Sequence, residues 1–198
     1  MRFFEGEVEP CINGRTVATG AYFGQDVRGI VDRLLGEQMA DGGWNCEQEN
    51  GSTRGSFDTT INVLEGLLQF ERATGGDGAV TDARVRGEEY LLTRGLLRRL
   101  SDGEVGQDRW LTLTFPHGWR YDVGRVLDYL RLARPEPDDR MAETLAILES
   151  KRGHDGRWRL EHAYHPGLLV DLGEAVGEPS RWLTLRALRV LRWAGITP

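Results

Sequence analysis

Basic residues do not dominate this sequence, and long apolar runs are missing from it. Its 198 residues include 25 Lys and Arg against 31 Asp and Glu, for a formal net charge of −6. A nucleic-acid-binding protein needs a basic face to neutralise phosphates, so this balance argues against a nucleic-acid partner. No apolar run approaches the roughly 20 residues of a membrane-spanning helix, so we expect no transmembrane segment. The first residues lack the apolar core of a signal peptide, which favours a cytoplasmic protein.

Cysteine and lysine are scarce as well. Lys151 is the single lysine, which is typical of proteins from GC-rich bacterial genomes. Cys11 and Cys46 are the two cysteines, and in a cytosolic chain we expect both to be reduced thiols. No Cys-x-x-Cys pair is present, so we expect no cofactor. Zinc remains an alternative because thiolates and imidazoles can bind it, with four candidate ligands in Cys11, Cys46, His162 and His165.

No alternating pattern of a β-sheet appears, and helical periodicity dominates. Residues 27–39, 80–100 and 138–150 each carry one apolar stripe, which predicts helices packed on one side. Residues 56–73, 121–132 and 180–193 are apolar on two sides, which predicts inner helices packed on both. The stretch 11–23 is a weaker inner candidate because of its glycines. Ser56 is a plausible N-cap, and Gly75-Gly76 a plausible stop, for 56–73. The only candidate strand, 111–115, is short. We therefore predict one all-α domain over residues 1–198.

A recurring turn follows the one-sided helices. Gln38 to Trp44 fits the pattern Gln-x-x-x-Gly-x-Trp, and Arg152 to Trp158 fits it with Arg in the first place. His117-Gly118-Trp119 is a degenerate third copy. Glycine permits the positive φ that a helix end requires, and tryptophan offers a large face and one N–H donor. We therefore expect these turns to fasten outer helices to inner ones.

These turns resemble the QW repeats of squalene–hopene cyclases and their relatives. The alternation of outer and inner helices resembles the α/α toroid shared with protein prenyltransferase β subunits, and residues 55–64 resemble the start of an inner helix in the cyclases. The resemblance implies a partial (α/α) toroid of about half a ring. Such a chain would be a piece of a longer protein, half of a homo-oligomer, or a small repeat domain around a small ligand.

The resemblance also implies where a site would lie. The toroid cavity is lined by inner helices and their preceding loops, which makes the expected ligand-binding residues Trp44, Cys46, Phe57, Trp119, Tyr121 and Trp182. The Asp-x-Asp-Asp-Thr acid segment of the cyclases corresponds here to residues 55–59, where Phe57 stands in place of the acid. Asp58 and Asp122 are the remaining catalytic candidates; both begin helices, so N-terminal capping is the alternative role.

Three functions remain open at this point. The first is an apolar cavity for an isoprenoid-like small molecule, with cyclisation or group transfer if the protein is an enzyme. The second is a non-catalytic repeat protein that binds another protein, or a second copy of itself, through a concave apolar face. The third is a zinc-dependent transferase. The basic stripe Arg186, Arg189 and Arg192 is either solvated, paired within the chain, or a clamp for a diphosphate.

Overall fold

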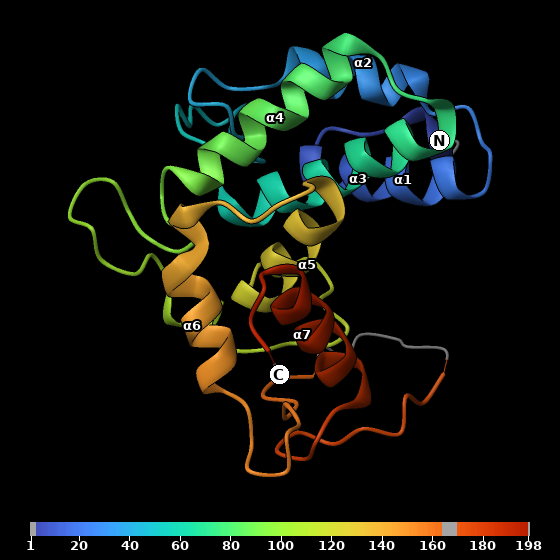
Figure 1. The fold of residues 1–198 in the computed structure, drawn as a ribbon. Coiled ribbons are helices and arrows are strands. Elements are labelled where there is room, and N and C mark those ends of the chain that lie inside the picture. The colour runs from blue at the N-terminus through green and yellow to red at the C-terminus, as the bar shows by residue number, and fades with distance from the viewer. Residues whose placement is uncertain (1–2, 164–169, 198) are drawn as a thin grey trace. The chain divides into compact units, whose positions relative to one another are not determined.

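The computed structural model describes residues 3–163 and 170–197, and the all-α prediction is confirmed for these residues (Figure 1). His165 lies outside the described residues. No strand forms within the described ranges, and residues 111–115 contribute an isolated bridge between Thr114 and His162 instead. The seven α-helices of these ranges are α1 (Pro10–Tyr22), α2 (Arg28–Gly36), α3 (Phe57–Thr74), α4 (Gly78–Leu92), α5 (Val123–Ala133), α6 (Ala142–Ser150) and α7 (Arg181–Trp193). Three short 3-10 helices accompany them: η1 (Phe3–Glu5), η2 (Asp108–Leu111) and η3 (Asp139–Met141).

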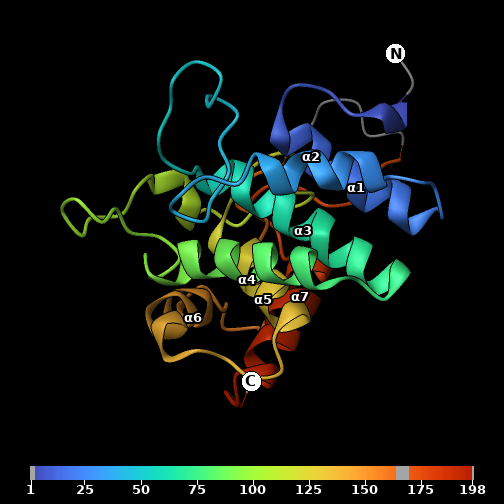
Figure 2. The same cartoon turned by 90° about the horizontal axis from the view of Figure 1, so that it is seen from above.

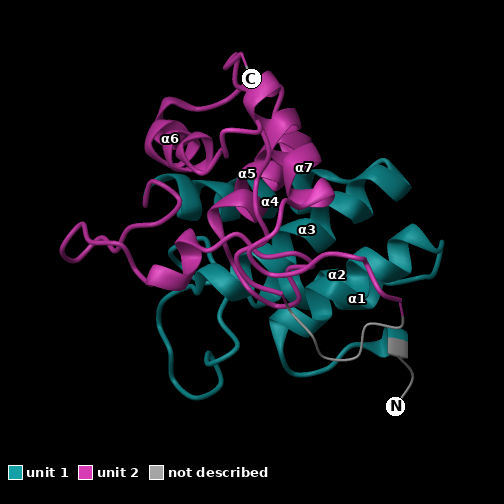
Figure 3. Ribbon diagram, turned by 90° about the horizontal axis from the view of Figure 1, so that it is seen from below, with its two compact units in different colours: residues 1–93 teal, residues 94–198 magenta. Residues whose placement is uncertain are grey.

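The helices group into two compact units, unit 1 (1–93) and unit 2 (94–198), coloured teal and magenta in Figure 3. Unit 1 contains α1 to α4, and unit 2 contains α5 to α7. The single domain over 1–198 and the partial toroid both stay predictions.

In unit 1, α1 runs side by side with α3 (Figures 1 and 2), and α3 also packs against α4. Glycine makes the first of these contacts possible. A Cβ on Gly14 would lie 2.5 Å from the backbone oxygen of Asn62, and one on Gly66 would lie 2.3 Å from the backbone oxygen of Gly14. The glycines that weakened the helix prediction for 11–23 therefore serve close packing of two backbones.

Helix α3 has the two packed sides that its apolar pattern predicted. Its buried residues lie all around the helix, among them Ile61, Val63, Leu64 and Leu67. The Ser56 side chain accepts a hydrogen bond from the Thr59 N–H at 3.4 Å, and Gly75 ends the helix with a φ of 86°. The sequence prediction for both ends of this helix is confirmed.

The predicted helix 80–100 is too long, because α4 ends at Leu92. The chain then turns, with Gly95 and Leu96 at φ values of 53° and 64°. Leu96 and Leu97 are nevertheless fully buried in this turn. These two leucines extended the apolar pattern of the sequence beyond Leu92. They are apolar because the turn is buried, and not because the helix continues.

In unit 2, α5, α6 and α7 contact one another in pairs. Leu127 and Leu130 of α5 are fully buried, and the side chains of Val190 and Leu191 of α7 are each only 1% exposed. Helix α7 is less enclosed than its sequence predicted, because Trp182 is 40% exposed.

The first turn motif is a buried joint between α2 and α3. Trp44 is fully buried, and its indole N–H donates to the carbonyl oxygen of Leu34 at 2.7 Å. Its backbone N–H donates to the Thr60 hydroxyl at 3.0 Å, and its carbonyl accepts from the Ser56 N–H at 2.8 Å. Gly42 precedes it with a φ of 88°. The turn therefore connects the end of one helix to the first turn of the next.

Trp158 makes the same joint between α6 and α7. It is fully buried, and its indole N–H donates to the Leu148 carbonyl at 2.7 Å. Its backbone N–H donates to the Thr184 hydroxyl at 3.1 Å, and its carbonyl accepts from the Ser180 N–H at 2.8 Å. Gly156 has a φ of 77°. The prediction that the two better motif copies fasten consecutive helices is confirmed in each unit.

The first residue of the motif acts differently in the two copies. The Gln38 amide donates to the Ala83 carbonyl of α4 at 2.8 Å and accepts from the Arg86 guanidinium at 2.9 Å. Arg152, which replaces it in the second copy, lies 5.8 Å from the centre of the Trp158 ring. The first copy thus also binds a third helix.

Within the part of the chain that the structure describes, no helix combines the length and the apolar character needed to cross a bilayer.

Candidate functional site

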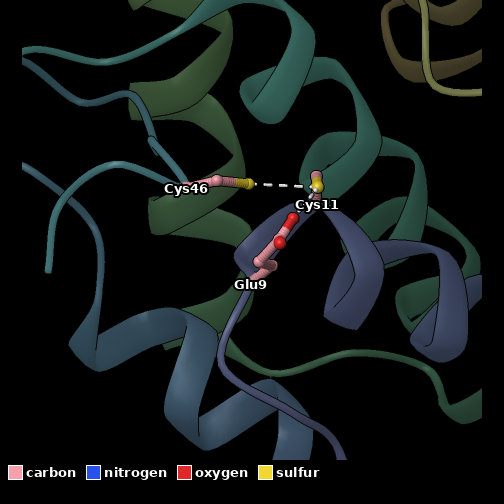
Figure 4. A group of neighbouring side chains, drawn as sticks. All are labelled: Glu9, Cys11 and Cys46. Atoms are coloured by element: carbon pink, nitrogen blue, oxygen red, sulfur yellow. Dashed lines mark hydrogen bonds between the residues drawn. The ribbon is translucent and has the colours of Figure 1, made fainter. Parts of the chain in front are cut away.

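The structure brings the two cysteines together in unit 1. Cys11 is the second residue of α1, and Cys46 lies two residues beyond the Trp44 joint. Their sulfur atoms are 3.0 Å apart, both side chains are half-buried, and both thiols are free (Figure 4). The expectation of two reduced thiols stays a prediction, and the structure adds that the two sulfur atoms are in direct contact.

Three neighbours hold this pair in position. Pro10 fixes the first turn of α1, where proline is well accommodated, and so orients Cys11. The backbone N–H of Cys46 donates to the Thr59 hydroxyl, which in turn donates to the Cys46 sulfur, each at 3.4 Å. Glu9 places a carboxylate oxygen 3.6 Å from the Cys11 sulfur. Both thiols therefore sit where the first turns of α1 and α3 begin.

The two thiols differ in acidity. The hydrogen bond between the two cysteines lowers the pKa of Cys46 to about 7 against the opposing effect of burial, and the Thr59 hydroxyl lowers it further. The same hydrogen bond raises the pKa of Cys11 far above its usual range; burial and the charges of Cys46 and Glu9 add to this. At neutral pH, Cys46 therefore carries much of the thiolate, and Cys11 keeps its proton.

Glu9 also completes a group of three donor atoms, with the Cys11 and Cys46 sulfurs, that all lie within 4.8 Å of one another. These donors suit zinc in kind, but structural zinc takes four ligands, and two thiolates on tetrahedral zinc lie about 3.8 Å apart. The observed 3.0 Å is shorter. His162 belongs to unit 2, and zinc stays a prediction. Sequence reasoning missed Glu9; its position two residues before Cys11 at a helix start was the available signal.

Unit 2 contains a small pocket with a mostly apolar lining. The residues around it are Leu113, His117, Gly124, Leu148, Leu183, Arg186 and Ala187. The Arg186 guanidinium donates to Nε2 of His117, because arginine stays protonated and has no acceptor. The other ring nitrogen, Nδ1, therefore carries the proton and donates to the Asp122 carboxylate at 3.2 Å. His117 therefore lies between the Arg186 guanidinium and the Asp122 carboxylate.

The two predicted acids both begin helices. Asp122 is fully buried, and its second oxygen accepts from the Arg125 N–H at 2.9 Å, so the capping alternative is confirmed for α5. Asp58 is the second residue of α3, which Ser56 caps. Both oxygens of Asp122 thus accept hydrogen bonds from donors within unit 2.

The aromatic residues predicted to line a cavity have different surroundings in unit 1. Trp44 is fully buried in the joint described above. Phe57 is 7% exposed and meets the ring of Tyr90 edge-on at 5.7 Å. Cys46, the third predicted residue of this unit, lies in the thiol pair. Of the three, Cys46 belongs to the site that the structure reveals.

In unit 2, the Tyr121 hydroxyl donates to the Leu96 carbonyl, and the residue is buried. Trp119 is 40% exposed, so the degenerate third turn does not form a buried joint. Trp182 stacks on Phe115 at 5.6 Å, and the Arg186 guanidinium lies 5.0 Å from the Phe115 ring centre. Phe115 was missed because the sequence placed it at the end of a candidate strand.

Comparisons of this chain with family models, with curated proteins and with solved structures found no match.

Proposed function

We propose that the protein is a helical-repeat domain of squalene-cyclase or prenyltransferase type that binds an apolar, isoprenoid-like ligand carrying an anionic group. The repeat carries this proposal. Trp44 and Trp158 use the same three hydrogen bonds to fasten successive helices, and such turns are the feature by which this sequence resembles those families.

The residues of the unit 2 pocket indicate which kind of ligand would bind there. Leu113, Leu183 and Ala187 give this small pocket an apolar lining, and it would have to widen to admit more than the end of a hydrocarbon chain. Arg186 offers a cation at the same pocket, and its Nε lies 3.7 Å from an oxygen of Asp128. A diphosphate or carboxylate head would compete for this guanidinium, because arginine pairs well with both.

The arrangement favours binding over turnover. Asp122 accepts one hydrogen bond from a backbone N–H and another from His117, so both of its oxygens are engaged within unit 2. This geometry is that of a helix cap, and it supports a structural role for Asp122 better than the acid role that cyclisation requires.

Calorimetry with farnesyl diphosphate as the probe tests the proposal. Arg186→Gln is expected to weaken binding about tenfold, because a charge-assisted contact to the head group is lost. The matched control is Arg189→Gln, an exposed position on the same helix that does not line the pocket. Farnesol, which lacks the anion, is expected to be insensitive to Arg186→Gln.

Three outcomes would contradict the proposal. The first is absence of binding of both probes together with a lipid-free organic extract of the purified protein. The second is an equal loss of binding in the two arginine variants. The third is a stable dimer without bound lipid in light scattering, which would favour the self-association alternative.

A further inference from the structure

We propose that Cys11 and Cys46 form a redox-active dithiol that reduces a hydroperoxide and closes into a reversible intramolecular disulfide. The site lies within unit 1, and it requires neither the unit 2 pocket nor its ligand. The proposal therefore stands or falls independently of the proposed function.

The sulfur atoms of Cys11 and Cys46 are close enough for a disulfide to form after a small movement. They lie 3.0 Å apart, so a bond of about 2.05 Å requires them to approach by about 1 Å. Cys46 begins a run of turns over residues 46–51, whose outer part is exposed, whereas Cys11 is fixed on α1. Figure 4 shows Cys46 on a loop and Cys11 on α1. Movement of the Cys46 loop alone can therefore bring the two sulfur atoms together.

The neighbours assign different roles to the two thiols. The Thr59 hydroxyl donates to the Cys46 sulfur, and the Cys11 thiol is its second hydrogen-bond partner. The bond from the Thr59 hydroxyl favours a thiolate at Cys46, and the lowered pKa of this residue agrees with that assignment. Glu9 disfavours a second negative charge at Cys11. Cys46 is therefore the attacking sulfur, and Cys11 is the resolving thiol.

The reaction balances in two steps. First, the Cys46 thiolate attacks the terminal oxygen of the hydroperoxide; the O–O bond breaks, a sulfenic acid forms on Cys46, and the departing alkoxide takes a proton from water. Second, Cys11 attacks the Cys46 sulfur; the S–O bond breaks and the disulfide forms. The Cys11 proton passes by way of the Glu9 carboxylate to the departing hydroxide, which leaves as water. Two electrons from the two thiols thus reduce one hydroperoxide to an alcohol and water.

The test uses the reduced 198-residue chain in the presence of a chelator, with one equivalent of hydrogen peroxide as the probe. We expect the intact mass to fall by about 2 Da as two thiol hydrogens are lost. Peptide mapping should find the Cys11 and Cys46 peptides linked, and dithiothreitol should restore both thiols. Peroxide consumption should exceed that of a free-cysteine peptide at neutral pH by about tenfold or more.

Single variants separate the two steps. Cys11→Ser is expected to leave the sulfenic acid on Cys46, where dimedone traps it. Cys46→Ser is expected to lower peroxide consumption to the level of the free-cysteine peptide. Glu9→Gln should slow disulfide formation without slowing formation of the sulfenic acid. Its matched control is Glu47→Gln, an exposed carboxylate beside Cys46 that hydrogen-bonds Asn50 instead of a sulfur.

The proposal is overturned if peroxide leaves the mass unchanged, or if the disulfides that form join two chains. It is also overturned if the chain purifies with one tightly bound zinc that protects both thiols, since the pair would then be a metal site. A stable sulfenic acid in the unaltered chain would contradict the resolving role of Cys11.

Discussion

The joints at Trp44 and Trp158 share the same three hydrogen bonds of the tryptophan, yet the segments that follow them differ. The threonine that accepts the backbone N–H of Trp44 lies 16 positions further along the chain, whereas the one that accepts that of Trp158 lies 26 positions further. The first segment carries Cys46, and the second leads to the helix that lines the unit 2 pocket. The joint thus tolerates inserts of different length and chemistry, because its bonds involve only the two ends of the segment.

Replacing either tryptophan with alanine should have the largest effect. Trp44→Ala and Trp158→Ala each leave a large buried cavity and an unpaired carbonyl, so we expect a loss of about 3–5 kcal/mol in the free energy of unfolding. Urea unfolding followed by circular dichroism measures both. If Trp158→Ala proves nearly neutral while Trp44→Ala does not, the two joints are not equivalent in energy.

Oxidation of the two cysteines should stabilise unit 1 and leave the stability of unit 2 unchanged. A Cys11–Cys46 disulfide joins residues 35 apart in sequence, and the chain-entropy model assigns such a loop about 4 kcal/mol of stabilisation. Hydrogen exchange of the oxidised chain should show slower exchange in unit 1, with unit 2 unchanged. Uniform slowing over both units would mean that they unfold as one body.

In unit 1, glycines allow the backbones of α1 and α3 to pack closely against each other. Gly14→Ala places a methyl group against the backbone of α3 and should destabilise the protein by about 1–3 kcal/mol. Gly29→Ala is the control, since no atom lies within 4 Å of its added Cβ, and it should stabilise α2 by about 0.5–1 kcal/mol. Thermal unfolding of both variants checks this; equal signs would contradict the packing argument.

The two serine caps should differ by a smaller amount. Ser56→Ala removes one N-cap bond and should cost about 1 kcal/mol. Ser180 is buried, and its hydroxyl also donates to the Glu174 carboxylate at 2.6 Å. Ser180→Ala should therefore cost about 2 kcal/mol, near the upper end for caps. Denaturant midpoints compare the pair, and a larger loss at Ser56 would reverse the expected order.

Features that depend on neighbouring residues were predictable from the sequence. The apolar stripes, the Ser56 cap, the Gly75 stop and the tryptophan turns are set by spacing within one or two helical turns. Local spacing misled at Leu96 and Leu97, because a buried turn and a helix present the same apolar residues. The sequence also placed Trp44 among the residues that line a cavity. Local spacing does not distinguish a tryptophan that is buried in a turn between helices from one that lines a cavity, because this depends on tertiary packing.

The sequence by itself determined a helical chain punctuated by glycine–tryptophan turns, because those choices are made by backbone preference and apolar periodicity. Only the tertiary structure decided that Cys11 meets Cys46 and that Arg186 meets His117 across 69 residues of chain. Such meetings depend on how helices pack against one another, and neither propensity nor periodicity encodes the rotation or register of one helix on the next.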